Sequence, residues 1–294
     1  MRQDRPPLAQ TRRLSLELNF VKINPSGNTT VLILDPLPRE LYARVASKVM
    51  KATSLSAEQV GFVEPATIPG ALGRLQMMGG EFCGNASRGF SAWLTDRQDP
   101  GIHFAKGLAT VEVLIEVSGH DGVLRATVNT GSSRRHVYSV AISMPVPQWI
   151  RQGSLEEGKR VYTRVGFEGI VHAVLWNQPP SKDQFDSIRA DMEKELGEVD
   201  CLGVMFYQED IQFLTPVVYV RSVGSLVWES SCGSGSVAVA AALAARERKS
   251  VEALKLSQPG GIIQTSVTWR DHAVEASISG DVAIEAVGIV FIEG

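Results

Sequence analysis

Two stretches of the sequence read alike and decide the fold: Glu81-Phe82-Cys83-Gly84-Asn85-Ala86-Ser87 and Ser231-Cys232-Gly233-Ser234-Gly235-Ser236. In each stretch cysteine and glycine stand directly ahead of an apolar run that is typical of a buried helix. The cysteines at positions 83 and 232 are 149 residues apart, about half of the 294-residue chain. A repeat at this distance predicts two similar halves that arose by duplication of one ancestral half.

The segments around these two stretches alternate between strand and helix patterns. Apolar runs of four to eight residues separated by turn residues predict strands, at residues 16–23, 29–34, 60–63, 110–117, 123–128, 137–144, 161–165, 170–176, 202–206 and 216–221. The first two of these strands form a hairpin-like opening around the turn at 24–28, and apolar residues at helical spacing predict amphipathic helices at 39–50 and 182–196. The pattern therefore indicates a mixed α/β (α+β) fold.

Composition and charge exclude several classes of protein. The chain is 44% hydrophobic and 21% charged, and its net charge of −3 is made of interspersed charges, so a nucleic-acid partner is not expected. The longest purely aliphatic stretch, 237–245, is far shorter than the roughly 20 residues that span a membrane, so no membrane partner is expected either. The polar, Arg- and Pro-rich residues 1–15 predict a disordered extension, with a targeting role left open.

Three cysteines, an odd number at wide spacing, form neither a disulfide framework nor a zinc motif. This usage predicts a cytoplasmic setting and no metal. At the first turn of a helix a cysteine faces unpaired backbone N–H groups and the positive end of the helix dipole, which stabilise a thiolate and can also bind a carboxylate. Cys83 and Cys232 both have this position. The alternative, that each is simply a small buried hydrophobe, fits Cys201 better, because Cys201 has no glycine-rich turn after it.

Against this background the sequence resembles the diaminopimelate epimerase-like superfamily of two-cysteine racemases and epimerases, over residues 18–294. The matching segments, in the order seen in that superfamily, are 20–28, 58–60, 83–88, 172–174, 232–235 and 279–280. The resemblance implies two pseudo-symmetric halves, each a curved, mostly antiparallel sheet wrapped round a central helix, with the active site between them. We expect residues 16–136 and the C-terminal strand 283–294 in the half of Cys83, and residues 137–282 in the half of Cys232.

Departures from diaminopimelate epimerase concern the far end of the substrate. The asparagines expected near Met77-Met78 and Ile170-Val171 are missing, and the arginine that would hold a distal carboxylate is replaced around 223–225, with Arg221 only loosely near. These replacements predict a more apolar pocket end. Histidine racemases of metallophore pathways, with Gly-Gly-Glu ahead of Cys-Gly-Asn-Ala, resemble this chain most, since it has Gly79-Gly80-Glu81 there.

The favoured hypothesis is therefore an isomerase that racemises histidine without pyridoxal phosphate or any other cofactor. Alternatives are diaminopimelate epimerase, a racemase of broader specificity, a phenazine-biosynthesis-type isomerase or hydroxyproline dehydratase, which usually lack one of the cysteines, and a non-enzymatic thiol sensor or binding module. The expected partner is a small amino acid, and a homodimer is a candidate assembly that the sequence does not decide.

In this hypothesis Cys83 and Cys232 act as base and acid on opposite faces of the α-carbon, and their roles swap with substrate chirality. Residues expected to bind substrate are Asn28, Gly84, Asn85, Ala86, His172, Glu229, Gly233, Ser234 and Gly235, with Glu81, Ser87 and Ser236 in support. His172 could orient or deprotonate a thiol, or be an ordinary buried histidine. Glu81 and Glu229 could bind the substrate ammonium or set thiol protonation, or be carboxylates that merely favour a helix start.

Overall fold

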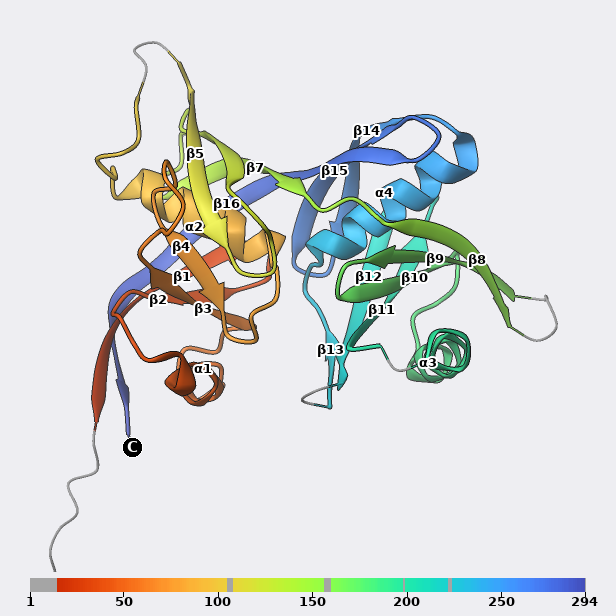
Figure 1. Ribbon diagram of the computed structural model, residues 1–294, viewed down its shortest axis with the longest axis horizontal. Coiled ribbons are helices and arrows are strands. Elements are labelled where there is room, and N and C mark those ends of the chain that lie inside the picture. Colours follow the sequence, from red (N-terminus) through yellow and green to blue (C-terminus); the bar gives the residue numbers. More distant parts are fainter. Residues whose placement is uncertain (1–14, 105–107, 156–159, 198, 222–223, 294) are drawn as a thin grey trace, which may run out of the picture.

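The computed structural model describes residues 15–104, 108–155, 160–197, 199–221 and 224–293 and shows two lobes side by side (Figure 1). Nearly all of the expected disordered extension, and residue 223 of the segment that replaces the distal arginine, lie outside the described residues. Within them, no helix is long and apolar enough to cross a membrane.

The first lobe is a ring of strands. Its members are β1 (Leu16–Pro25), β2 (Thr30–Ile33), β3 (Gln59–Glu64), β4 (Arg74–Met77), β5 (Thr110–Val117), β6 (Leu124–Asn129), β7 (Val137–Met144) and part of the long β16 (Ala273–Ile292). Neighbours in this order are hydrogen-bonded, and β16 also pairs with β1, which closes the ring. All pairs are antiparallel except β2–β3 and β4–β5.

The second lobe repeats this plan. From β16 the sheet continues through β15 (Gly261–Trp269), β14 (Val251–Gln258), β12 (Phe213–Val220), β11 (Cys201–Gln208), β10 (Ile170–Trp176), β9 (Arg160–Phe167) and β8 (Trp149–Leu155), while the short β13 (Ser225–Trp228) pairs with β12. Here β10–β11 and β12–β14 are the parallel pairs. The predicted pseudo-symmetric, mostly antiparallel halves are thus confirmed.

The two lobes interlock through their central strands. β7 and β16 run antiparallel, with Ile142 opposite Ile278, and β16 then continues to lie beside β1. In the matching way, the chain that leaves β7 forms β8, which pairs with β9 of the second lobe. The chain thus crosses between the lobes twice: after β7 it passes from the first lobe into the second, and along β16 it returns to the first lobe. The exact boundaries at 136/137 and 282/283 stay a prediction.

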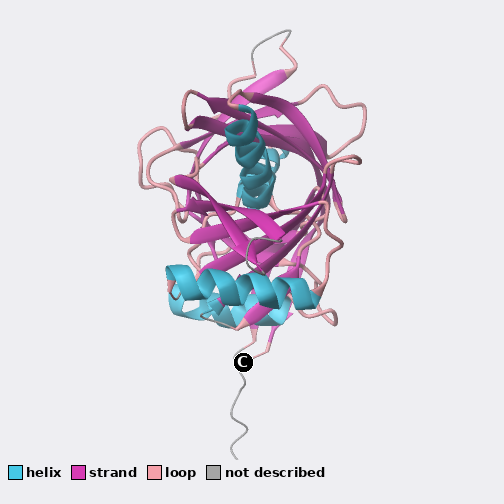
Figure 2. Cartoon of the chain, turned by 90° about the vertical axis from the view of Figure 1, so that its right-hand side faces the viewer, coloured by secondary structure: helices cyan, strands magenta, loops and turns pink. Residues whose placement is uncertain are grey.

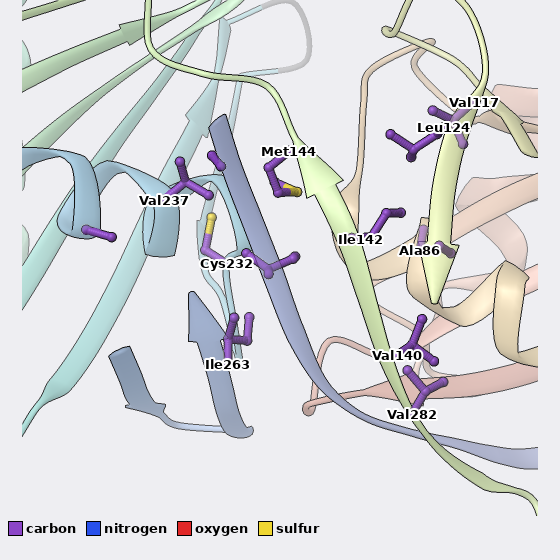
Figure 3. Packing of buried hydrophobic residues seen from close by; sticks show 14 of the residues in the cluster. Ala86, Val117, Leu124, Val140, Ile142, Met144, Cys232, Val237, Ile263 and Val282 are labelled. Carbon is purple, nitrogen blue, oxygen red and sulfur yellow. The ribbon is translucent and has the colours of Figure 1, made fainter. Parts of the chain in front are cut away.

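The sheet of each lobe encloses one helix, α2 (Gly84–Asp96) in the first lobe and α4 (Gly233–Glu247) in the second. In α2 all residues but the last are buried, and in α4 small residues, mostly alanine, are buried over most of the helix. A helix that is buried all round needs this composition, because the sheet wraps it closely. Figure 2 shows the strands surrounding the central helices. Figure 3 shows Met144 and Ile142 of β7 between Val237 of α4 and Ala86 of α2.

Two amphipathic helices cover the outside of the rings. The short turn η1 (Arg39–Leu41) leads into α1 (Tyr42–Val49), whose buried face packs in a cluster with Phe62. In the second lobe α3 (Lys182–Leu196) buries Phe185, Ile188 and Met192 against strands β9 to β12. Both helices lie where the sequence predicted them, although the first begins as a 3-10 turn. Sequence patterns had not identified β4, β8, β13, β14 or β15.

A contact between two turns joins the lobes on one side. Gly27, with φ +89°, lies in the β1–β2 turn, and a Cβ atom there would come within 2.3 Å of the Gly260 backbone in the β14–β15 turn. Because the obstacle is backbone, it cannot move aside as a flexible side chain could. Glycine at position 27 is therefore required both by the dihedral angle and by the close approach.

We predict that Gly27→Ala lowers the free energy of unfolding by about 1–3 kcal/mol more than Gly122→Ala, because only position 27 adds overpacking. Gly122 has a similar φ of +85°, and no atom of a described residue lies within 4 Å of an added Cβ there, so its alanine variant measures the dihedral cost alone. Urea denaturation of both variants checks this. Equal losses would contradict the contact between the turns.

Candidate active site

Each Cys-Gly pair of the repeated stretches is a helix start in the structure. Cys83 is the N-cap of α2 and Cys232 the N-cap of α4, both in extended conformation, and their sulfur atoms accept hydrogen bonds from Ala86 N (3.3 Å) and Gly235 N (3.4 Å). The matched serines Ser87 and Ser236 donate to the carbonyls of their own cysteines, each at 2.7 Å. The two sites thus have the same local geometry, as their sequences predicted.

The two helix starts are tied to each other. The Asn85 amide in the first turn of α2 donates to the carbonyl and the hydroxyl oxygen of Ser231, both at 3.2 Å, directly ahead of Cys232. Asn85 is itself held by Arg88 Nη2, which donates to Asn85 Oδ1 at 2.7 Å. Arg88 is fully buried, and burial lowers the pKa of its guanidinium to about 10. Sequence reasoning had not singled out Arg88, whose charge within an apolar helix was the available signal.

Glycine lets both helix starts approach the central strands. A Cβ on Gly84 or Gly233 would come within 3.0 Å of the same atom, Ile278 Cδ1 of β16. Met144 Sδ of β7 would lie even closer to a Cβ on Gly84, at 2.6 Å. The predicted pocket residues Gly84 and Gly233 therefore have a packing role, because they let both helices pack on one pair of side chains.

The Cys83 thiol has a defined partner. It donates a hydrogen bond to Gln59 Oε1 at 2.8 Å, and because a carboxamide oxygen only accepts, Cys83 is protonated in this arrangement. Burial raises its pKa to about 12, and the carboxylates of Glu81 and Glu229 add to this shift. Gln59 had no predicted role, although it lies in one of the matching segments.

The Cys232 thiol is set between a carboxyl and a hydroxyl. Cys232 is 7% exposed, its backbone N–H is held by Gln258 Oε1 (2.8 Å), and Ser234 Oγ lies 3.6 Å from its sulfur. Burial raises the pKa of this thiol, and the nearby Glu229 carboxylate, with which it shares a hydrogen bond, raises it further. Burial also raises the pKa of Glu229 to about 7, and no described residue forms a hydrogen bond with Glu229 Oε2.

His172 on β10 reaches Cys232 only through Ser234. Its Nε2 atom lies 2.9 Å from Ser234 Oγ, the ring is fully buried, and burial lowers its pKa to about 3, so the imidazole is neutral. Its Nδ1 atom has no hydrogen-bond partner among the described residues and faces Gly203, where a Cβ would come within 2.1 Å. This geometry supports a role in which His172 orients the Cys232 thiol through the Ser234 hydroxyl.

Asn28 follows Gly27 in the β1–β2 turn and is buried at the lobe junction. Its amide donates to Glu58 Oε2 at 2.8 Å, while Glu58 Oε1 accepts from Ser230 Oγ of the second lobe. Asn28 Oδ1 has no hydrogen-bond partner in the part of the chain that the structure describes. Glu58, which sequence reasoning assigned no role, therefore links the predicted residue Asn28 to the segment that leads into Cys232.

The residues expected at the far end of the substrate do not form one apolar surface. Met78 packs against the α1 cluster and Val171 lies within the α3 cluster, whereas Met77 and Ile170 belong to the central core. The expectation that all four line the pocket is thus wrong, because successive residues of a strand point to opposite faces. Arg221 forms an ion pair with Glu193 of α3 at 2.5 Å.

Cys201 opens β11 and is half-buried, and burial raises the pKa of its thiol. Among the described residues, no three His, Cys, Asp or Glu side chains gather in the way that a metal ion requires.

Comparison with solved structures shows the fold. A probable proline racemase from Agrobacterium radiobacter superimposes with a TM-score of 0.62 at 13% identity, covering 93% of this chain and 92% of that one. A phenazine biosynthesis protein of the PhzF family from Bacillus anthracis also gives 0.62, at 16% identity and with 95% and 100% covered. A predicted epimerase from Pseudomonas aeruginosa gives 0.63, at 13% identity with 93% and 99% covered.

Comparison of sequences is more specific. A curated histidine racemase from Fusobacterium nucleatum is 34% identical over 282 residues, which cover 94% of this chain and 97% of the relative. One from Staphylococcus aureus is 28% identical, with 94% and 98% covered. Residues 17–291 match the family described as the histidine racemase CntK N-terminal domain. With the paired cysteine-headed helices, this match over nearly the whole chain shows that the protein belongs to the histidine racemase family.

Proposed function

We propose that this enzyme interconverts L- and D-histidine, with Cys83 and Cys232 as the acid and base on opposite faces of the α-carbon. The observation that carries the proposal is the tie between two matched helix starts, in which Asn85 of one binds Ser231 ahead of the other. Family membership and the curated histidine racemases at 28–34% identity support histidine as the substrate.

Substrate binding follows from the helix starts. The first-turn N–H groups of α2 and α4 and the positive ends of their dipoles favour an anion, so the α-carboxylate would lie there, near Asn85, Ser234 and the N–H of Gly235. Negative charge that develops on the substrate after loss of the α-proton would be stabilised by the same groups. Ser87 and Ser236 already donate to the cysteine carbonyls, so we assign them a supporting role.

Proton transfer uses the different partners of the two thiols. Glu229, hydrogen-bonded to Cys232, can accept its proton and leave a thiolate as the base, while Cys83 holds its proton against Gln59 as the acid. The thiolate removes the α-proton, the carbanion takes the proton of Cys83, and the thiolate and thiol have then exchanged places. The opposite enantiomer uses them in reverse. No step requires pyridoxal phosphate or a metal, so we propose a cofactor-independent reaction.

Retention of both cysteines favours a racemase over phenazine-type isomerases and hydroxyproline dehydratases. We also propose a reducing, cytoplasmic setting, which three free thiols suit. A metallophore pathway is the proposed consumer of D-histidine, on the strength of the resemblance alone.

For assembly we propose a homodimer, and its support is the exposed row of Val287, Ile289 and Phe291 on one face of β16.

We predict that Cys83→Ala and Cys232→Ala each lower kcat/KM for histidine by about 10²–10⁴-fold, the usual contribution of a positioned acid or base. Cys201→Ala is the matched control and should keep most of the activity. Chiral chromatography of the product checks all three variants. Equal losses at the three positions would indicate that the cysteines have a structural role.

We predict that kcat/KM falls as the pH drops below about 7, because Glu229, whose pKa is raised to about 7, then holds a proton and cannot accept one from Cys232. Glu229→Gln should lower activity and remove this acidic limb. A limb that persists in Glu229→Gln belongs to another group, such as the substrate imidazole, and would overturn the role of Glu229. Measuring kcat/KM against pH for the wild-type protein and for Glu229→Gln distinguishes these outcomes.

A further inference from the structure

The two carboxylates close to the cysteines in sequence lie in different surroundings. Glu229 touches the Cys232 thiol and also acts electrostatically on Cys83. Glu81 is exposed at the surface and, within the part of the chain that the structure describes, forms no hydrogen bond with either cysteine, although partial burial of its carboxyl raises the pKa of that group. A position that is open to solvent yet near a thiol suits contact with a substrate group better than proton transfer to sulfur.

A glycine turn holds the Glu81 carboxylate. The chain turns after β4, with Gly80 N donating to Met77 O at 3.0 Å and Gly80 at φ +81°. Any Cβ on Gly79 would come within 2.6 Å of Glu81 Oε2, and the carboxylate accepts hydrogen bonds from the backbone N–H groups of Gly79 and Glu81. Gly79 and Gly80 are thus both needed for the carboxylate to fold back over the turn.

A second loop fixes the backbone of this turn. Ser118 Oγ, at the end of β5, donates to Glu81 O at 2.8 Å and accepts from Met77 N at 2.9 Å. Next to it, Gly119 packs so closely that a Cβ would come within 2.3 Å of Phe82 N. The carboxylate therefore projects from a backbone held at both ends, which is the preorganisation expected of a binding group.

The position of Glu81 relative to the helix starts indicates which part of a substrate it meets. It stands two residues ahead of Cys83, and its charge also acts on Cys201 of the second lobe. Cys201 lies on the same face of β11 as Gly203, which contacts His172. An amino acid with its carboxylate at the helix starts and its α-carbon between the thiols would extend its side chain toward this edge.

We propose that Glu81 is a specificity-determining residue that accepts a hydrogen bond from an N–H group of the substrate's imidazole. This proposal rests on the proposed function and names the residue that recognises the substrate side chain. A carboxylate held in this way favours a side chain with an N–H donor, since an apolar ring of equal size leaves it unpaired and an acidic side chain is repelled. In this proposal the Glu81 carboxylate contacts the substrate side chain, in place of the apolar pocket end that the sequence suggested.

The test compares histidine with β-(2-thienyl)-L-alanine, whose ring is of similar size but carries no N–H. Glu81→Ala should raise the KM for histidine by about 10- to 100-fold, as expected for loss of a hydrogen bond to a charged group, with a smaller effect on kcat. The inhibition constant of thienylalanine should stay the same or fall. Glu81→Gln, which keeps a neutral acceptor, should give an intermediate KM. Glu17→Gln, an exposed carboxylate of β1, is the control, and thermal melting verifies folding.

Each outcome decides between the inference and the function on which it rests. If Glu81→Ala weakens the binding of histidine and of thienylalanine alike, or lowers kcat with KM unchanged, Glu81 does not recognise the side chain. The racemase proposal stands in that case. If the wild-type protein fails to racemise histidine, the proposed function itself fails. A selective loss for histidine, partly rescued by glutamine, supports the inference.

Discussion

The structure depends on one constraint: two buried helices begin at the same place inside the molecule, and the N–H groups of their first turns must find partners there. A buried N–H group without a partner is costly, so a helix start inside a protein requires a cap or a bound anion. Here a cysteine sulfur caps each helix and accepts an N–H from the first turn. The remaining positive potential of both helix ends is where the proposed thiol chemistry and carboxylate binding would coincide.

Much of the architecture follows from holding these two ends together. β7 and β16 cross between the lobes, and both helices need glycine to pack on Ile278. Arg88 is buried at a cost in desolvation, and it holds Asn85, which in turn binds Ser231 in the other lobe. This chain thus has near-symmetric helix starts, while Gln59 beside one thiol and Glu229 beside the other give the two sulfurs different hydrogen-bond partners.

Most of the fold could be predicted from sequence, because the repeated Cys-Gly stretch and short apolar runs carry it. β4 and β13 were missed since each has only four residues, β8 since few of its residues are apolar, and β14 and β15 since polar residues interrupt them. The cysteine-headed helices were also predictable. Gln59, Glu58 and Arg88 were not, because their roles arise only when distant segments meet, and Met78 and Val171 were misplaced because strand faces depend on register.

The central claim is that two thiols act on opposite faces of one α-carbon. The most direct test is to incubate the protein with L-histidine in heavy water and to follow deuterium at the α-carbon of both enantiomers at early times. The account predicts that the D-histidine formed carries solvent deuterium while the remaining L-histidine keeps its proton, because one group removes the proton and another supplies the deuteron. D-histidine that retains the original proton would mean a single base and would contradict the account.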